Sequence, residues 1–210
     1  MSTIASEVAR KLLSIKAVKL QPKNPFKWAS GINSPIYCDN RILLSYPDVR
    51  TYIKTALVNK LLAFPDFDVI AGVATAGIPH GALLADATDK PFIYVRSKNK
   101  EHGRQNLIEG ELKEGSKVLV VEDLISTGMS SMAAVDALID KGADVIGVLA
   151  IFTYGFDVSK ELFTSRNIPL ETLSNYRVLL QEAVDSNYIN KDDKSTLETW
   201  NKDPKGWKSS

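Results

Sequence analysis

Hydrophobic and polar positions follow two periods along this chain, one typical of helices and one typical of buried strands. Apolar residues at positions 4, 8, 12 and 15 recur at helical spacing and predict a helix over residues 3–16. Stretches of the same period, bounded by helix-start and helix-stop residues, predict further helices at 47–62, 78–86, 129–141, 157–166, 175–186 and 191–201. Short runs of apolar residues predict strands at 36–38, 68–73, 91–95, 117–121, 144–152 and 170–173.

The order of these elements predicts the fold class. From residue 68 onward, apolar strands alternate with helices, which is typical of an α/β fold with a central, mostly parallel sheet flanked by helices. We therefore predict a single domain over residues 1–210. Within it, residues 46–210 form the α/β core with the C-terminal helices, and residues 1–45 form an appended helix and cap. Gly142 stands where a C-cap glycine is expected after the 129–141 helix.

One long segment breaks the alternation. The 21 residues between Val95 and Lys117 show neither period; nine are charged and three are glycine. Five of the first nine residues, Arg96 to Arg104, can carry positive charge. Because long loops inside compact domains are usually functional or disordered, we predict a basic lid over an anionic ligand.

The most informative stretch is 118–131. Four apolar residues lead into Glu122 and Asp123, which we expect at or past the exposed end of a strand because neighbouring strand residues point to opposite faces. Carboxylates accept hydrogen bonds from sugar hydroxyls. The hydroxyl-rich turn that follows opens a helix, where free N–H groups favour an anion. Taken alone, the turn could be ordinary N-capping and the acidic pair could be two solvated acids. Taken together, the acidic pair and the turn predict a ligand with sugar hydroxyls and a phosphate.

This stretch is one of three polar, glycine-containing segments that follow predicted parallel strands, the others being 74–79 and the lid. Ligands of open parallel sheets bind at the carboxyl ends of the strands, so we expect the three segments to form one site. The sequence contains neither G-x-x-x-x-G-K-[ST] nor G-x-G-x-x-G, which disfavours P-loop nucleotide hydrolysis and dinucleotide binding.

Composition and charge disfavour several classes of partner, metal site and location. A net charge of +1 provides no overall field for nucleic acid or an anionic membrane, so neither is predicted as a partner. No apolar run approaches the ~18 residues of a membrane span, and the N-terminus lacks the apolar core of a signal peptide. One cysteine and two histidines give no zinc-like cluster. We predict a cytoplasmic protein.

The acidic pair and the turn after it resemble the phosphoribosyl diphosphate (PRPP) motif of the type I phosphoribosyltransferases. Similarity to one family of this group, the orotate phosphoribosyltransferases, and to its Gram-positive form in particular, extends over most of residues 1–155. It is carried by residues 28–31, 34–39, 74–79, 94–103 and 120–131. The resemblance implies the type I fold with an N-terminal hood and a long flexible lid loop. It also implies an enzyme of UMP synthesis that converts orotate and PRPP to orotidine 5′-monophosphate and pyrophosphate with Mg²⁺.

The resemblance further implies roles for individual residues. Glu122 and Asp123 would hold the ribose hydroxyls, and the loop through Ser130 would cradle the 5′-phosphate. The implied PRPP-binding residues are Arg96, Lys100, His102, Glu122, Asp123, Leu124, Ile125, Ser126, Thr127, Gly128, Met129 and Ser130. The implied pyrophosphate loop is Thr75, Ala76 and Gly77. Orotate would be held by Ser126, Tyr37 and Cys38.

The expected catalytic residues are Lys100, His102 and Asp123. In the family, Arg96, Lys100 and His102 reach the pyrophosphate from the neighbouring subunit of a homodimer. Negative charge grows on the leaving group as a cationic sugar forms, so lid cations act most strongly in the transition state. We expect Lys100 to have the largest effect. Mg²⁺ would be held mainly by PRPP, with Asp123 as the candidate protein ligand.

The chain departs from some relatives where they carry positive residues, notably at Ala29 and Thr75-Ala76, and it has no arginine in 151–155. We therefore expect main-chain groups near Tyr37 and Cys38 to hold orotate. Two alternatives stay open: a phosphoribosyltransferase for a purine or uracil, and a PRPP-sensing regulator without catalysis. The hood-like 26–40 segment favours orotate, and the absence of an evident DNA-binding segment disfavours the regulator.

Overall fold

The computed structural model describes residues 3–27, 31–97 and 107–207. The chain forms two compact units, one comprising Met1–Arg50 with Ser174–Ser210, and the other Thr51–Leu173. The C-terminal helices therefore group with the N-terminal segment, whereas the sequence placed them with the α/β core. That residues 1–210 act as one domain stays a prediction.

The unit 51–173 is built on a six-stranded sheet with the order β10-β9-β8-β5-β6-β7. Its strands are β5 (Val69–Val73), β6 (Phe92–Val95), β7 (Ile108–Glu109), β8 (Lys117–Ile125), β9 (Asp144–Thr153) and β10 (Leu170–Asn175). The helices are α2 (Pro47–Lys60), α3 (Gly77–Thr88), α4 (Met129–Ile139) and α5 (Asp157–Ser165), with the 3-10 turn η2 (Leu61–Ala63). The pairs β5–β6, β5–β8 and β8–β9 are parallel, which confirms the predicted fold class.

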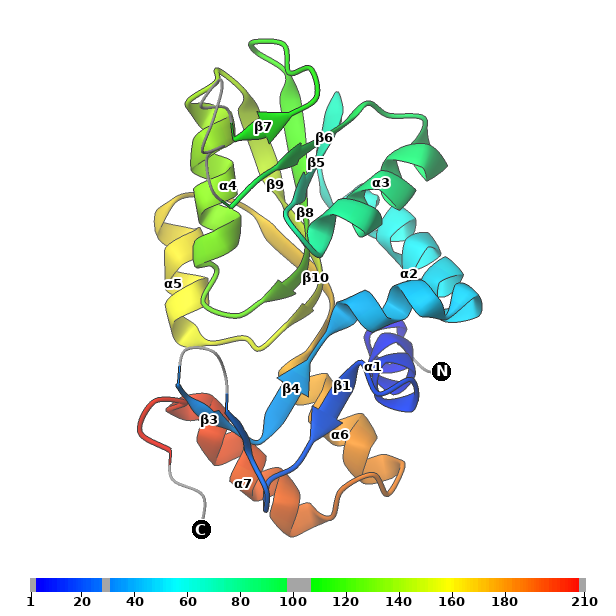
Figure 1. Ribbon diagram of the computed structural model, residues 1–210, viewed down its shortest axis with the longest axis vertical. Coiled ribbons are helices and arrows are strands. Elements are labelled where there is room, and N and C mark those ends of the chain that lie inside the picture. The colour runs from blue at the N-terminus through cyan, green and yellow to red at the C-terminus, as the bar shows by residue number, and fades with distance from the viewer. Residues whose placement is uncertain (1–2, 28–30, 98–106, 208–210) are drawn as a thin grey trace. The chain divides into compact units, whose positions relative to one another are not determined.

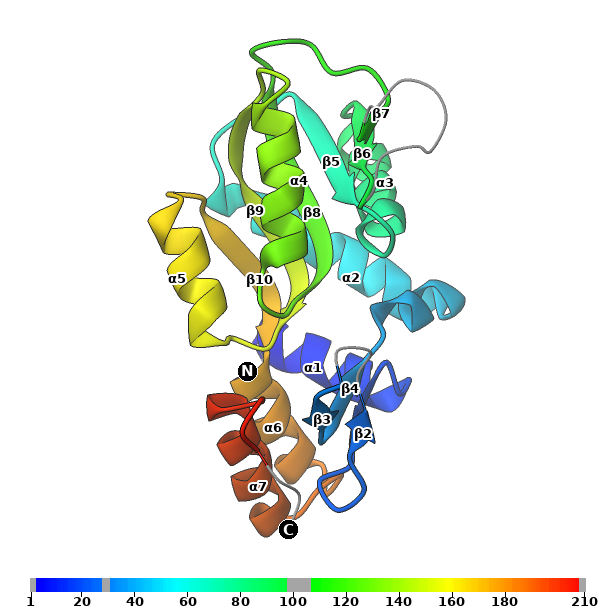
Figure 2. The same cartoon turned by 60° about the vertical axis from the view of Figure 1, so that its left-hand side comes forward.

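Helices cover both faces of this sheet, as continuous apolar strands require (Figures 1 and 2). On one face, Val135 of α4 and Phe163 of α5 join alternate residues of β5, β8 and β9 in a buried core. On the other face, α3 lies close to β5 because glycines form the contact. A Cβ added at Gly81 would lie 2.8 Å from Phe92 Cε2, and one at Gly72 would lie 2.9 Å from Ile78 Cα.

Two strands differ from the sequence prediction. β8 continues to Ile125 instead of ending at Val121, so the prediction that the acidic pair lies at or past the strand end was wrong, and both acids lie within the strand. The physical reason is β9, whose ladder with β8 continues through the pairs Glu122–Ala150 and Ile125–Thr153. β7, which lies in the segment predicted to lack strands, pairs antiparallel with β6 and is too short to show a period.

The end of α4 follows the prediction for Gly142, which adopts a φ of +79°. The Gly142 N–H donates to Ile139 O and the Ala143 N–H donates to Leu138 O, as in a Schellman motif. This turn directs the chain into β9.

The other unit combines helices with two small antiparallel sheets, β1–β4 and β2–β3. Its elements are α1 (Ile4–Ser14), β1 (Val18–Leu20), β2 (Phe26–Lys27), β3 (Asn33–Ser34), β4 (Ile36–Cys38), η1 (Asn40–Ser45), α6 (Tyr176–Asp185) and α7 (Lys191–Lys202). The Ser174 hydroxyl donates to Ala5 O, and the fully buried Trp200 donates through Nε1 to Asn33 O, 3.2 Å away. These long-range bonds join the two ends of the chain in one unit. Within the described ranges, no helix has the length and apolar character needed to cross a membrane.

Candidate active site

The carboxyl ends of three parallel strands meet at one edge of the sheet. In the ladders, Val73 pairs with Val95 and Gly72 pairs with Val121. The segments that follow β5 and β6, together with the last residues of β8, therefore start side by side. The first residues of the three polar segments thus lie at one edge of the sheet, and that the segments form one site stays a prediction.

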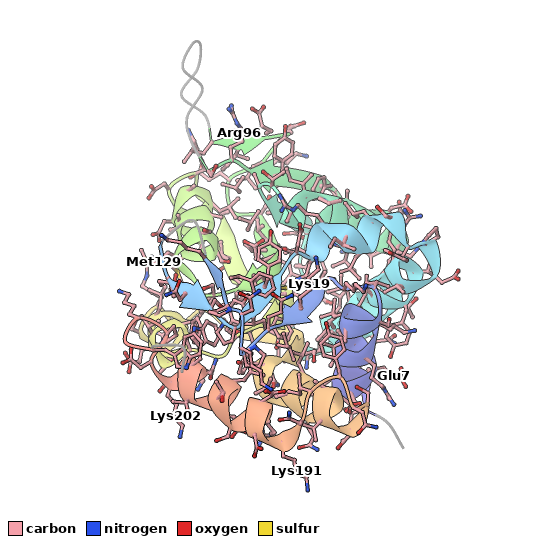
Figure 3. All side chains as sticks on the ribbon, turned by 60° about the horizontal axis from the view of Figure 1, so that its bottom comes forward. Glu7, Lys19, Arg96, Met129, Lys191 and Lys202 are labelled. Atoms are coloured by element: carbon pink, nitrogen blue, oxygen red, sulfur yellow. The ribbon has the colours of Figure 1, made fainter. Side chains whose placement is uncertain are left out.

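A pocket of about 300 Å³ lies at this edge, within the unit 51–173. It is bounded by the ends of β5 and β6 and by the first turns of α4. Its lining residues are Val73, Ala74, Val95, Arg96, Ser97, Leu107, Met129, Ser130, Ala133 and Ala134. Figure 3 labels Arg96 and Met129, two predicted PRPP contacts from different elements that both line the pocket.

The turn between β8 and α4 presents its backbone as a binding surface. Gly128 takes a φ of +83°, and a Cβ there would lie 2.8 Å from Phe163 Cε2, so glycine is required for both conformation and space. Thr127, Met129 and Ser130 are exposed. Across the part of the chain that the structure describes, the backbone N–H groups of residues 127–131 have no protein acceptor. This is the arrangement that favours an anion at a helix start.

The two acids differ in environment. Asp123 is half-buried, whereas Glu122 is only 6% exposed. Glu122 Oε1 accepts a hydrogen bond from the Asp123 N–H at 2.9 Å, and Glu122 Oε2 accepts one from Ser131 Oγ at 3.3 Å. Burial, and then the neighbouring charge of Asp123, raise the pKa of Glu122 well above its ordinary value. Asp123 is therefore the better placed of the two to accept hydrogen bonds from a ligand.

The segment predicted to hold pyrophosphate leads from β5 into α3. The Ala74–Thr75 peptide bond is cis, and Thr75 is exposed. Gly77 opens α3 directly against β8, since a Cβ there would lie 2.5 Å from Val121 O. His80, in the first turn of α3, is 2% exposed and packs inside the protein.

Three described residues of the lid, Arg96, Ser97 and Leu107, line the pocket. Arg96 is 31% exposed and forms an ion pair with Glu109 of β7, with 3.5 Å between Nη1 and Oε1. Lys100 and His102 lie outside the described residues, so their catalytic roles stay predictions. Arg96 also stays a predicted contact.

Tyr37 and Cys38 belong to the other unit, so their prediction as orotate contacts is untested. Tyr37 is 39% exposed and packs on Phe26 with ring centroids 5.5 Å apart. Beside them, hydrogen bonds from Arg41 lower the pKa of Asp39. Among the described residues, no group of three or more His, Cys, Asp or Glu gathers to hold a metal ion.

Two polar residues near this site, Ser131 and Glu109, had no predicted role. Ser131 follows the predicted phosphate loop, but its buried hydroxyl bonds to Glu122 and not to the exposed side of the turn. Glu109 lies in a two-residue strand that has no sequence signal.

A parallel sheet with an acidic pair and an open, hydroxyl-rich helix start at its carboxyl edge is the arrangement of a phosphoribosyltransferase. Residues 43–186 match the family model for the phosphoribosyl transferase domain. An orotate phosphoribosyltransferase from Cytophaga hutchinsonii is 54% identical over 203 residues, with 96% of this chain and 97% of the relative covered. One from Listeria innocua is 53% identical over 206 residues, with 98% and 99% covered.

The chain thus belongs to the orotate phosphoribosyltransferase family, which confirms the predicted resemblance. The fold agrees. The crystal structure of orotate phosphoribosyltransferase from Aeropyrum pernix superposes with a TM-score of 0.76 at 27% identity, covering 87% of this chain and 99% of that one.

Proposed function

We propose that this enzyme transfers the 5-phosphoribosyl group from PRPP to orotate, giving orotidine 5′-monophosphate and pyrophosphate in UMP synthesis. The observation that carries the proposal is the segment 123–131. There, a half-buried carboxylate is followed by a helix start whose N–H groups have no acceptor among the residues that the structure describes. Family membership supports the choice of substrates.

Binding of PRPP follows from these groups. The Asp123 carboxylate accepts hydrogen bonds from the ribose hydroxyls, and the N–H groups of residues 127–131 donate to the 5′-phosphate. Both ends of the sugar phosphate are then fixed, so C1 of the ribose is held in one orientation for attack.

In the transfer, the bond from ribose C1 to the diphosphate oxygen breaks, N1 of orotate forms the new bond to C1, and N1 releases its proton to solvent. The leaving diphosphate gains negative charge, so cations near it lower the barrier. Arg96 lines the pocket at the end of β6, which supports its role beside the diphosphate. We assign the largest effect to Lys100, with His102 beside it, in the lid that follows Arg96.

The residues at this edge of the sheet can hold Mg²⁺ together with the substrate. Mg²⁺ prefers hard oxygen ligands and is held by one or two carboxylates together with substrate phosphates. Asp123 supplies such a carboxylate, and Mg²⁺ held there would neutralise charge on the diphosphate. No larger protein cage is needed.

We further propose a homodimer in which Arg96, Lys100 and His102 serve the partner's site, and a cytoplasmic location suited to the biosynthetic role. Ser126 and the main chain at Tyr37 and Cys38 hold orotate. A base-covering role for 26–40 would explain the selection of orotate.

The direct test is an assay of PRPP consumption with Mg²⁺ and, in separate reactions, orotate, uracil, hypoxanthine and adenine. We expect turnover with orotate and equimolar release of pyrophosphate. Activity with a purine alone would contradict the substrate assignment. Salt-sensitive binding to DNA without turnover of any base would instead indicate a PRPP-sensing regulator.

A further inference from the structure

The turn that we assign to the phosphate has both of its ends attached to one carboxyl group. It runs from the end of β8 at Ile125 to the start of α4 at Met129, with Glu122 and Asp123 on the strand before it and Ser131 on the helix after it. Glu122 Oε1 accepts from the Asp123 N–H on the strand side, and Glu122 Oε2 accepts from the Ser131 hydroxyl on the helix side. A single side chain therefore spans the turn.

This carboxyl also packs against the start of α3. A Cβ on Gly77 would lie 3.4 Å from Glu122 Oε1 and 3.3 Å from Glu122 Cα. The ends of β8, α3 and α4 therefore converge on Glu122, which is 6% exposed, while Ser131 is 2% exposed. A buried pair of this kind fixes the elements that it joins, because neither partner has water as a substitute.

Resting on the proposed function, we propose that Ser131 is a positioning residue of the PRPP site. It acts through Glu122, whose carboxyl sets the separation between Asp123 and the first turn of α4. Asp123, which accepts from the ribose hydroxyls, is thereby held at a fixed distance from the N–H groups that receive the phosphate.

The experiment measures kcat, the KM for PRPP with orotate, and the Kd for PRPP by calorimetry with Mg²⁺. We expect Ser131→Ala to raise KM and Kd about tenfold, as for leaving a buried hydrogen-bonding group without its partner, with kcat changed far less. Glu122→Ala, which removes the acceptor of the Ser131 hydroxyl, should do at least as much. Ser131→Thr, which keeps the hydroxyl, should recover part of the affinity.

Ser159→Ala is the matched control. Ser159 is also the third residue of a helix, α5, is 1% exposed, and donates to Phe156 O at 2.7 Å. Ser159→Ala should lower thermal stability about as much as Ser131→Ala and leave the KM for PRPP unchanged. The double variant Glu122→Ala/Ser131→Ala should bind PRPP no more weakly than Glu122→Ala, since Ser131 acts through Glu122.

Two results would overturn the inference: equal KM changes in Ser131→Ala and Ser159→Ala, or additive losses in the double variant. Folded wild-type protein that binds no PRPP would overturn both this inference and the proposed function. Binding and turnover in wild type with either of the two results would overturn the inference alone.

Discussion

Replacing Gly128 with alanine tests the turn at its most constrained point. The residue has a φ of +83°, and an added Cβ would lie 2.8 Å from Phe163 Cε2 and 3.4 Å from Leu162 Cδ2. The left-handed conformation costs an alanine about 1–2 kcal/mol. The contact with Phe163, whose ring is 3% exposed and has little room to move, adds about 1–3 kcal/mol.

Gly115→Ala separates the two contributions. Gly115 has a similar φ of +78°, but nothing lies within 4 Å of its added Cβ. Since 1 kcal/mol shifts the midpoint by roughly 2–4 °C in a protein of this size, Gly115→Ala should lower Tm by about 2–8 °C and Gly128→Ala by about 4–20 °C.

The KM for PRPP should distinguish Gly128→Ala from Gly115→Ala more clearly than Tm does. A shift of the turn moves the N–H groups of residues 127–131, so Gly128→Ala should raise the KM for PRPP at least about tenfold. Gly115→Ala should leave it unchanged. Thermal unfolding by circular dichroism and steady-state kinetics at 25 °C are the assays, since room temperature is well below the expected midpoints. Equal Tm shifts, or an unchanged KM in Gly128→Ala, would refute the reasoning.

The remaining predictions concern charge and the lid. Lys100→Ala should lower kcat by orders of magnitude while PRPP still binds; an unchanged kcat would remove the lid role. Mixing inactive Lys100→Ala and Asp123→Ala proteins should restore activity if sites are shared between subunits, and no recovery despite shown subunit exchange would exclude sharing. The raised pKa of Glu122 means that the folded protein keeps this proton to higher pH than the unfolded chain, whose value is near 4.5. The stability that Glu122 contributes is present below pH 4.5 and is lost as pH rises through the folded pKa. The Tm of Glu122→Gln should therefore increase relative to that of wild type as pH rises. A difference in Tm between the two proteins that stays constant with pH would contradict this.

The sequence predicts the α/β core well because its strands are continuous apolar runs separated by helices of ordinary length. It places the end of β8 four residues early, because carboxylates look like a strand end and pairing with β9 is a tertiary effect. β7 is missed because two residues show no period. The grouping of α6 and α7 with α1 depends on contacts such as Ser174 with Ala5, which no local pattern contains.

The sequence also predicts the main parts of the candidate site. Residue types and order predict the turn, its glycine and the acidic pair, since each has a chemical requirement that the sequence displays. The sequence does not say which acid is buried. That depends on the approach of α3 at Gly77 and of α4 at Ser131, and these give Glu122 and Asp123 different environments.

The central claim is that Asp123 and the turn after it hold PRPP, and calorimetric titration with PRPP and Mg²⁺ tests it most directly. We predict saturable binding of one PRPP per subunit in wild type and binding weakened at least about tenfold in Asp123→Asn, which keeps the size of the side chain but removes its charge. Equal affinity in the two proteins, or no heat of binding from folded wild type, would contradict the account.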